Sequence, residues 1–187
     1  MISMPLTEGW HVREAGGERW HPAAVPGHVH LDLLQAGLLD DPFVGDGEAR
    51  AQWVGERDWD YRLRFDAPPG VLACGRARLV CEGLDTYATV RLNDHVVLEA
   101  DNMFRPWIAD VRPLLRPDGN ELTIRFRSPL KEVRPRLQDA AHRLPCPNDQ
   151  AGGTSPYTRK AQYQYGWDWG PCLVTCGPWR GIRLEAW

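Results

Sequence analysis

Apolar and polar residues alternate along several segments of the chain, and this pattern predicts short β-strands. In the clearest segment, Trp59, Tyr61, Leu63 and Phe65 share one face and charged residues occupy the other. A period of two residues is typical of a strand that is buried on one side. The alternation, less regular in places, predicts strands at Arg57–Phe65, Arg76–Cys81, Thr86–Asn93 and Glu121–Arg127. After the turn Asn93-Asp94, His95–Leu98 is the expected second arm of a hairpin, and Gly181–Trp187 is the expected last strand after the break at Gly177-Pro178.

Helical signals are short. Val29–Gln35 before Gly37 and Val111–Leu115 are candidate helices, whereas Lys131–His142 is polar without a clear pattern. Residues 144–157 are rich in proline, glycine and asparagine, and they predict a long loop of the kind that often carries function. Many short strands without a strand–helix–strand rhythm predict an all-β fold, an antiparallel jelly-roll β-sandwich with a few short helices.

The length and composition fit one globular domain covering residues 1–187, with 43% hydrophobic and 25% charged residues. A net charge of −3 argues against nucleic-acid and membrane-surface partners, because no basic field would attract a polyanion. The first residues do not resemble a signal peptide, and no segment has the apolar length of a membrane span. We therefore expect a cytoplasmic protein.

The five cysteines predict neither a disulfide framework nor a metal site. Their number is odd, and Cys172 and Cys176 are four positions apart, which is not the spacing of a zinc site. We expect all five to be reduced and to act as small apolar side chains. Neither a metal nor another cofactor is expected.

The run Tyr165–Pro171 carries the most specific chemistry in the chain. Trp167 and Trp169 flank Asp168, with a glycine on each side of the group. An ionised carboxylate accepts hydrogen bonds only, and flat indole rings can lie against the C–H faces of a sugar. The run therefore suggests a sugar site. The alternative is that both tryptophans are core residues and Asp168 closes a turn, and spacing alone slightly favours this alternative.

Other titratable groups have simpler explanations. Asp58 and Asp60 share a strand face and could mimic the carboxylate pair of a retaining glycosidase, which is roughly 5–5.5 Å apart. A solvated strand face is the favoured interpretation. His28 and His30 could suggest a metal pair, but no third ligand is suitably spaced, so a hydrogen-bonded histidine at a helix start is favoured.

Several motifs in order resemble the glycoside hydrolase family that contains β-mannosidase, β-galactosidase and β-glucuronidase, and in particular the N-terminal domain of its β-mannosidases. The matching segments are Val25–Leu34, Asp41-Pro42, Gly45–Glu48, Trp53-Val54, Asp58–Tyr61, Glu82–Thr86, Leu92-Asn93, Asp101–Trp107, Arg159–Gln162, Tyr165–Pro171 and Trp179-Arg180. The match departs from the family at Gly47, where the pattern has asparagine. The resemblance covers nearly the whole chain.

This resemblance implies a sugar-binding jelly roll that is followed, in the family, by an immunoglobulin-like domain and a (β/α)₈ barrel with two catalytic glutamates. A barrel needs about 250 residues. We therefore expect no catalytic residue in this chain and no hydrolysis by it alone. The implied function is that of an accessory domain of a retaining exo-β-mannosidase, with β-mannosides and the two further domains as partners.

The resemblance also implies roles for single residues. Asp168 and Trp167 would bind mannose in the −1 subsite, supported by Trp169, Tyr165 and Arg159, the last by pairing with a carboxylate or bracing the loop. Two alternatives remain. One is a free-standing carbohydrate-binding module or lectin, and the other is the corresponding domain of a β-galactosidase, β-glucuronidase or exo-glucosaminidase.

Overall fold

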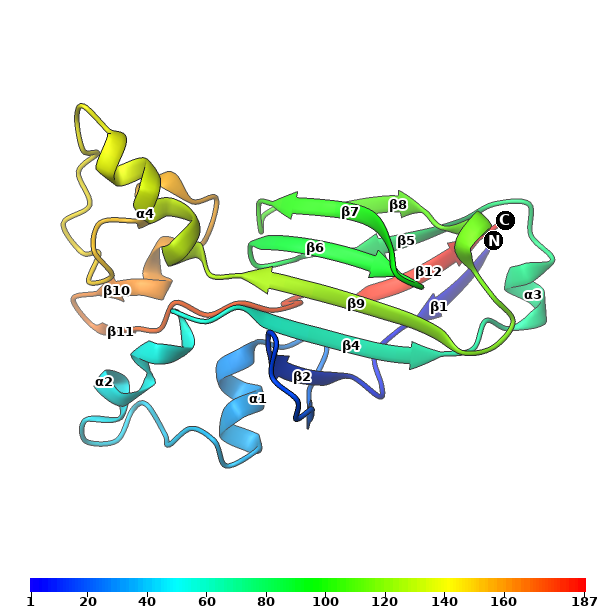
Figure 1. Cartoon of the computed structure of the whole chain (residues 1–187), viewed down its shortest axis with the longest axis horizontal. Coiled ribbons are helices and arrows are strands. Elements are labelled where there is room, and N and C mark those ends of the chain that lie inside the picture. Colours follow the sequence, from blue (N-terminus) through cyan, green and yellow to red (C-terminus); the bar gives the residue numbers. More distant parts are fainter.

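Two antiparallel sheets lie face to face in the computed structural model, which describes all residues from Met1 to Trp187 (Figure 1). The larger sheet has the order β3 (His21–Pro22), β2 (His11–Glu14), β4 (Trp59–Phe65), β9 (Asn120–Arg127), β6 (Tyr87–Leu92) and β7 (His95–Asp101). The smaller sheet has the order β1 (Ile2–Pro5), β12 (Ile182–Ala186), β5 (Ala77–Cys81) and β8 (Trp107–Asp110). The predicted all-β sandwich is confirmed.

The core lies between the sheets and is built by the apolar face of each alternating strand. Tyr61 on β4 meets Phe126 on β9 edge to face, with ring centroids 5.6 Å apart. Leu79 and Leu184 close the core from the smaller sheet, and all four side chains are buried. Burial of each such side chain stabilises the fold by roughly 1.5–3 kcal/mol. The hydrophobic alternation therefore determines which face of each strand points inward.

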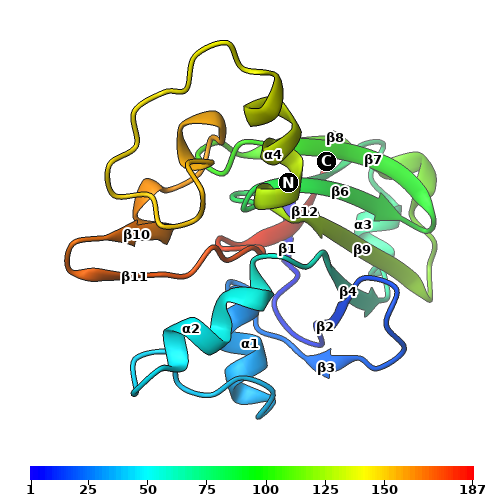
Figure 2. The same ribbon diagram turned by 60° about the vertical axis from the view of Figure 1, so that its left-hand side comes forward.

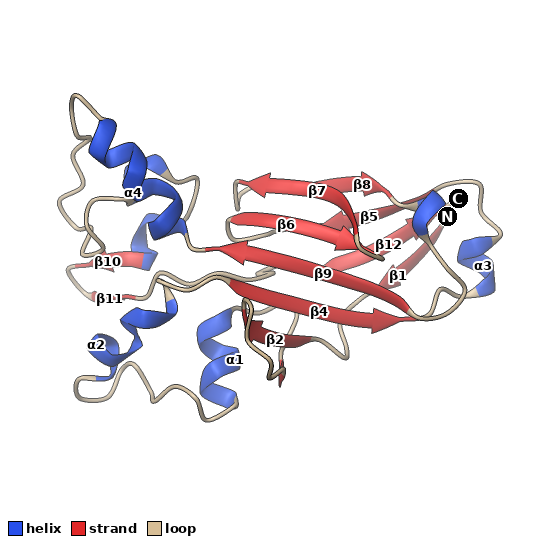
Figure 3. Cartoon of the chain, in the orientation of Figure 1, coloured by secondary structure: helices blue, strands red, loops and turns tan.

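Four short α-helices and four 3₁₀ turns decorate the sandwich (Figure 3). The helices are α1 (Val29–Gln35), α2 (Gly47–Ala51), α3 (Pro69–Leu72) and α4 (Pro129–Asp139). The 3₁₀ turns are Gln52–Val54, Arg112–Leu114, Ser155–Tyr157 and Gln162–Gln164. No helix combines the length and the apolar composition needed to cross a bilayer. All five cysteines are free thiols, of which Cys81, Cys172 and Cys176 are buried.

Most predicted elements are confirmed, with shifted ends. The strands of the six predicted segments are β4, β5, β6, β7, β9 and β12, and the helix Val29–Gln35 is α1. The predicted helix Val111–Leu115 is only a 3₁₀ turn, Arg112–Leu114. The polar stretch from Lys131 belongs to α4, which Ser128 caps by accepting a hydrogen bond from the Lys131 amide.

Irregular segments gather at one end of the sandwich. A hairpin of β10 (Tyr165–Trp167) and β11 (Gly170–Cys172) extends beyond the sheets, beside α4 and α2, as Figures 1 and 2 show. Both chain termini lie at the opposite end, where β1 pairs with β12. This arrangement collects most of the long connections around the aromatic run.

Candidate functional site

The aromatic run forms a tight hairpin. Trp167 pairs with Gly170, so Asp168 and Trp169 are the two residues of the connecting turn. Gly166 before them has φ +100, a conformation that other residues resist, and a Cβ there would lie 2.8 Å from the Gln150 side chain. Glycine at this position therefore lets the backbone pass Gln150 and reach the turn.

The base of the hairpin is tied to the rest of the domain. The Gln150 amide donates to the Tyr165 carbonyl at 2.8 Å, and the Cys172 amide donates to Glu48 Oε1 at 2.8 Å. Gln52 Nε2 donates to the Cys172 carbonyl at 2.7 Å, and the Tyr165 ring is fully buried. The hairpin thus has a fixed base and a free tip.

The tip exposes its side chains. Trp167 is 37% exposed, Trp169 is 81% exposed, and Asp168 is exposed as well. The two indole rings contact each other, with centroids 6.1 Å apart. Trp169 therefore packs on Trp167 rather than in the core, and the acceptor positions of Asp168 face solvent.

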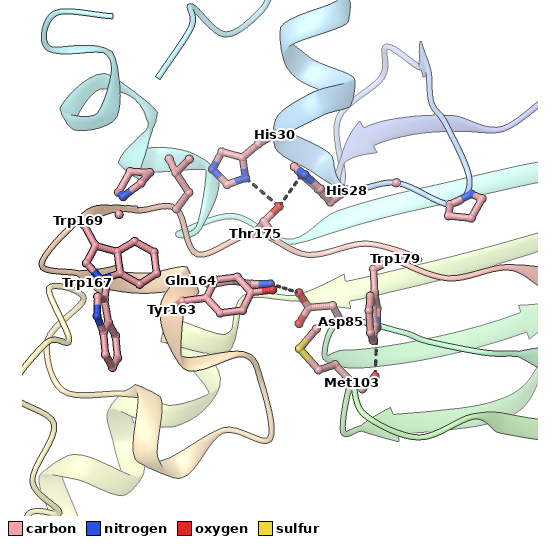
Figure 4. Close-up of a pocket in the computed structure, with 15 residues that line it drawn as sticks. His28, His30, Asp85, Met103, Tyr163, Gln164, Trp167, Trp169, Thr175 and Trp179 are labelled. Carbon is pink, nitrogen blue, oxygen red and sulfur yellow. Dashed lines mark hydrogen bonds between the residues drawn. The ribbon is translucent and has the colours of Figure 1, made fainter. Parts of the chain in front are cut away.

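A cavity of about 500 Å³ lies beside the hairpin (Figure 4). Its apolar lining comes from Trp167, Trp169, Tyr163, Trp179, Met103, Leu173 and two prolines, and its polar lining from His28, His30, Asp85, Gln164 and Thr175, with two glycines. Asp168 does not line it. Aromatic faces with a few convergent polar groups are typical of a small-molecule site.

Asp85, which lines this cavity, forms a buried ion pair with Lys160, which lies behind the lining. Lys160 Nζ donates to both Asp85 oxygens at 2.6 Å and to the Thr175 carbonyl at 2.7 Å. Both side chains are almost fully buried, at 0% and 2% exposed. Gln164 Nε2 and Thr86 Oγ1 also donate to Asp85. Every Lys160 proton has an acceptor, so this pair holds three chain segments together.

The two histidines share one hydroxyl group. Thr175 Oγ1 lies 2.9 Å from His30 Nδ1 and 3.2 Å from His28 Nδ1. Burial lowers the pKa of His30 to about 3, with a further contribution from His28 and Lys160. Burial also lowers the pKa of His28, helped by Lys160 against the opposing effect of Asp85. Both rings are therefore neutral at pH 7. Both are within hydrogen-bond distance of Thr175, in line with the interpretation favoured from the sequence, a hydrogen-bonded histidine at a helix start.

Arg159 lies outside the cavity. Its guanidinium donates to Asp101 Oδ2 at 2.7 Å, and the two side chains are 65% and 54% exposed. Its carbonyl accepts a hydrogen bond from the Met103 amide at 3.0 Å. These contacts connect the segment that leads into the hairpin to the end of β7.

We predicted that Asp58 and Asp60 lie on a solvated strand face, and this prediction is wrong for Asp60. Its side chain is only 9% exposed, because Arg13 and Arg125 cover and pair with it. Asp58 accepts a hydrogen bond from the Ser128 amide at 2.9 Å. Each carboxylate thus has its own structural partners, and neither lines the cavity.

Residues 10–180 match the family described as glycosyl hydrolase 2 galactose-binding domain-like. This chain belongs to that family. The motif resemblance is thereby confirmed at the level of the family. The match covers all the hairpin and cavity residues, because they lie between Pro26 and Trp179.

Two relatives that the chain resembles in sequence are β-mannosidases. The chain is 45% identical over 188 residues to β-mannosidase B of Thermothelomyces thermophilus, covering 98% of this chain and 22% of that protein. It is 42% identical to β-mannosidase B of Aspergillus terreus, covering 97% and 22%. The chain thus spans about a fifth of the length of these relatives.

Solved structures of two glycosidases superpose on this chain. β-D-mannosidase from Dictyoglomus thermophilum superposes with a TM-score of 0.93 and 38% identity, over 100% of this chain and 23% of that one. The exo-chitosanase of Amycolatopsis orientalis superposes with a TM-score of 0.68 and 16% identity, over 100% and 21%. The second likeness concerns the fold alone.

Proposed function

We propose that this chain acts as the accessory N-terminal domain of a retaining exo-β-mannosidase, which releases terminal non-reducing β-D-mannose. In this role Trp167 and Asp168 complete the −1 subsite of a pocket whose catalytic glutamates belong to a barrel domain. Asp168 accepts hydrogen bonds from mannose hydroxyls, and Trp167 forms a wall beside the ring. The chain hydrolyses nothing by itself.

The observation that carries this proposal is the free tip of the β10–β11 hairpin. Trp167 at the end of β10 and Asp168 in the turn lie together at the tip of a hairpin that projects beyond the sandwich and is anchored at its base (Figure 2). The Asp168 side chain is exposed and forms no hydrogen bond or ion pair with its own domain. An exposed carboxylate between two exposed indoles is instead suited to a ligand, or to a pocket completed by another domain.

The test uses a chimaera in which residues 1–187 replace the matching segment of the Dictyoglomus thermophilum β-D-mannosidase. Asp168→Asn should lower kcat/KM for a chromogenic β-mannoside by about tenfold to hundredfold, the contribution of one hydrogen bond to a charged group. Asp118→Asn is the matched control. Asp118 is also exposed, but it lies in the turn that precedes β9, at the end of the sandwich remote from the hairpin (Figure 1). It should leave kcat/KM unchanged.

Two results would contradict the proposal. One is a kcat/KM of the Asp168→Asn chimaera within twofold of its parent. The other is hydrolysis by the 187-residue chain alone that persists through purification and scales with its concentration.

A free-standing carbohydrate-binding module is the second candidate, and the cavity is the observation that favours it. A volume of about 500 Å³ lined by three tryptophans is large enough for a sugar ring within this one chain. Titration of the isolated chain with mannose separates the two functions. The accessory role predicts a Kd weaker than about 1 mM, whereas a binding module predicts a tighter one.

A further inference from the structure

A second groove lies on the outer face of the six-stranded sheet, away from the hairpin. It has a volume of about 440 Å³ and shares no residue with the first cavity. We call it the arginine groove, and its lining is Arg13, Trp20, Asp60, Arg62, Thr89, Arg91, Asp94, Glu121, Thr123, Arg125 and Arg127. Five arginines face three acidic residues there, although the whole chain has a net charge of −3. The groove is therefore locally positive.

One row of residues across the sheet shows how this face holds a carboxylate. Arg13, Asp60 and Arg125 are register partners on β2, β4 and β9. Arg125 donates to both Asp60 oxygens, at 2.7 and 3.0 Å, and Arg13 Nε donates to Oδ2 at 3.3 Å. Two arginines from the outer strands thus clamp one carboxylate on the strand between them.

The adjacent row also contains two arginines on either side of one residue, but that residue is a threonine and not a carboxylate. Arg62, Thr123 and Arg91 are register partners on β4, β9 and β6, two residues along from the first row. Strands are spaced about 4.8 Å apart, so the Arg62 and Arg91 backbones are about 10 Å apart. Two long side chains at that separation can reach one anion above Thr123.

Neither arginine of this second row is neutralised within the chain. The Arg62 guanidinium stacks on the Trp20 ring at 4.1 Å, and Arg91 Nη1 donates to the Asp94 carbonyl at 3.0 Å. Neither forms a salt bridge, unlike the nearby Arg64, which pairs with Glu121 at 2.9 Å. The stacking on Trp20 orders Arg62 without removing its charge.

We propose that the arginine groove binds a carboxylate-bearing saccharide, such as a uronate, whose carboxylate bridges Arg62 and Arg91. The guanidinium fork matches the two oxygens of a carboxylate. The Thr89 and Thr123 hydroxyls are both half-buried in the groove. Thr89 Oγ1 accepts a hydrogen bond from Arg127 Nη1 at 2.9 Å and keeps its own proton to donate to a sugar hydroxyl. The volume exceeds that of a bare ion and falls in the range of small-ligand sites.

The test titrates the 187-residue chain with glucuronate and follows binding by calorimetry and by the amide and indole NMR signals. Glucuronate should shift the Trp20 indole signal, and neutral glucose should not. The Arg62→Gln/Arg91→Gln variant should bind glucuronate about tenfold more weakly or worse, since each lost contact is a hydrogen bond to a charged group. Arg105→Gln is the matched control, because Arg105 also stacks on an indole ring, that of Trp107 at 4.1 Å, and lies outside the groove.

Several results would overturn the proposal. They are unchanged groove signals with glucuronate, equal weakening by Arg105→Gln, or binding of inorganic phosphate as tight as that of glucuronate. Tighter binding of a polyglutamate peptide, with displacement of glucuronate, would assign the groove to an acidic protein segment instead. The melting temperature of each variant, measured alongside, shows whether the fold is intact, so that a loss of binding can be assigned to the missing charges.

Discussion

Replacing Lys160 with methionine removes the charge that pairs with the cavity residue Asp85 while keeping most of the side-chain volume. The wild-type ammonium makes three hydrogen bonds, two to Asp85 and one to the Thr175 carbonyl. In the variant, Asp85 keeps only the donors from Gln164 and Thr86. A carboxylate that is almost fully buried would then have no counter-ion.

The expected loss of stability is large. Breaking a buried ion pair from one side costs about 3–5 kcal/mol, because the remaining charge stays out of water. Each kcal/mol lowers the melting temperature of a domain of this size by about 2–4 °C, so Lys160→Met should melt roughly 6–20 °C lower. Such a loss is a considerable part of the 5–15 kcal/mol that is usual for the whole free energy of unfolding.

Urea unfolding followed by tryptophan fluorescence and by circular dichroism measures this loss. Arg159→Met is the matched control, because the neighbouring residue pairs with Asp101 at the surface, where an ion pair contributes about 0–1 kcal/mol. The double variant Lys160→Met/Asp85→Asn should lose less stability than Lys160→Met alone, since it removes the stranded charge as well.

The reasoning would be refuted if Lys160→Met destabilised the fold by no more than Arg159→Met. It would also fail if the double variant were less stable than the single one, because the cost would then not arise from the unpaired carboxylate.

Two further predictions concern the cavity walls. The pKa of His30 is about 3 in the folded chain and 6.5 in the unfolded chain. As the pH falls below 6.5, His30 therefore becomes protonated in the unfolded state but not in the folded state, and the free energy of unfolding decreases. Between pH 7 and 5.5 the wild type should lose about 1 kcal/mol more than His30→Gln in urea unfolding, and equal losses would contradict this. Gly83→Ala would place a Cβ 2.5 Å from Trp179 Nε1. The indole would have to move, which should break its hydrogen bond to the Met103 carbonyl and lower the free energy of unfolding by about 1–3 kcal/mol. An unchanged Trp179 indole NMR signal would contradict this prediction, because it would show that the added methyl group fits beside the ring.

Most strands that the sequence predicted have a buried face. β4 and β9 alternate because one side of each packs in the core. β1 and β8 are four residues long, lie at the two edges of the smaller sheet and bury almost nothing, so they carry no such pattern. α4 contains Pro135, which made a helix hard to predict from its composition.

The site was predictable only in part. The aromatic run singled out Trp167 and Asp168, but β10 and β11 are three residues each and contain glycine and proline, which conceal a hairpin. Lys160 and Asp85 both lie in family motifs, yet they are 75 positions apart, and composition alone places a lysine on the surface. Their pairing, like the cavity above it, exists only in three dimensions.

One departure from the family pattern has a steric explanation. At Gly47, where the pattern has asparagine, a Cβ would lie 2.2 Å from the Asp41 carbonyl oxygen. The loop before α2 therefore follows a path here that leaves no space for a side chain, while Glu48, the next residue of the motif, still accepts the hydrogen bond from Cys172.

The pairing of β1 with β12 has a practical consequence. It places both chain ends at the pole of the sandwich that is remote from Trp167 and Asp168 (Figure 1). A tag, a fluorescent label or a surface linkage at either end would leave the hairpin accessible to sugars. In a fusion, a polypeptide joined after Trp187 has to extend along the long dimension of the sandwich to contact the hairpin. The linker in a chimaera must therefore be long enough to span that distance.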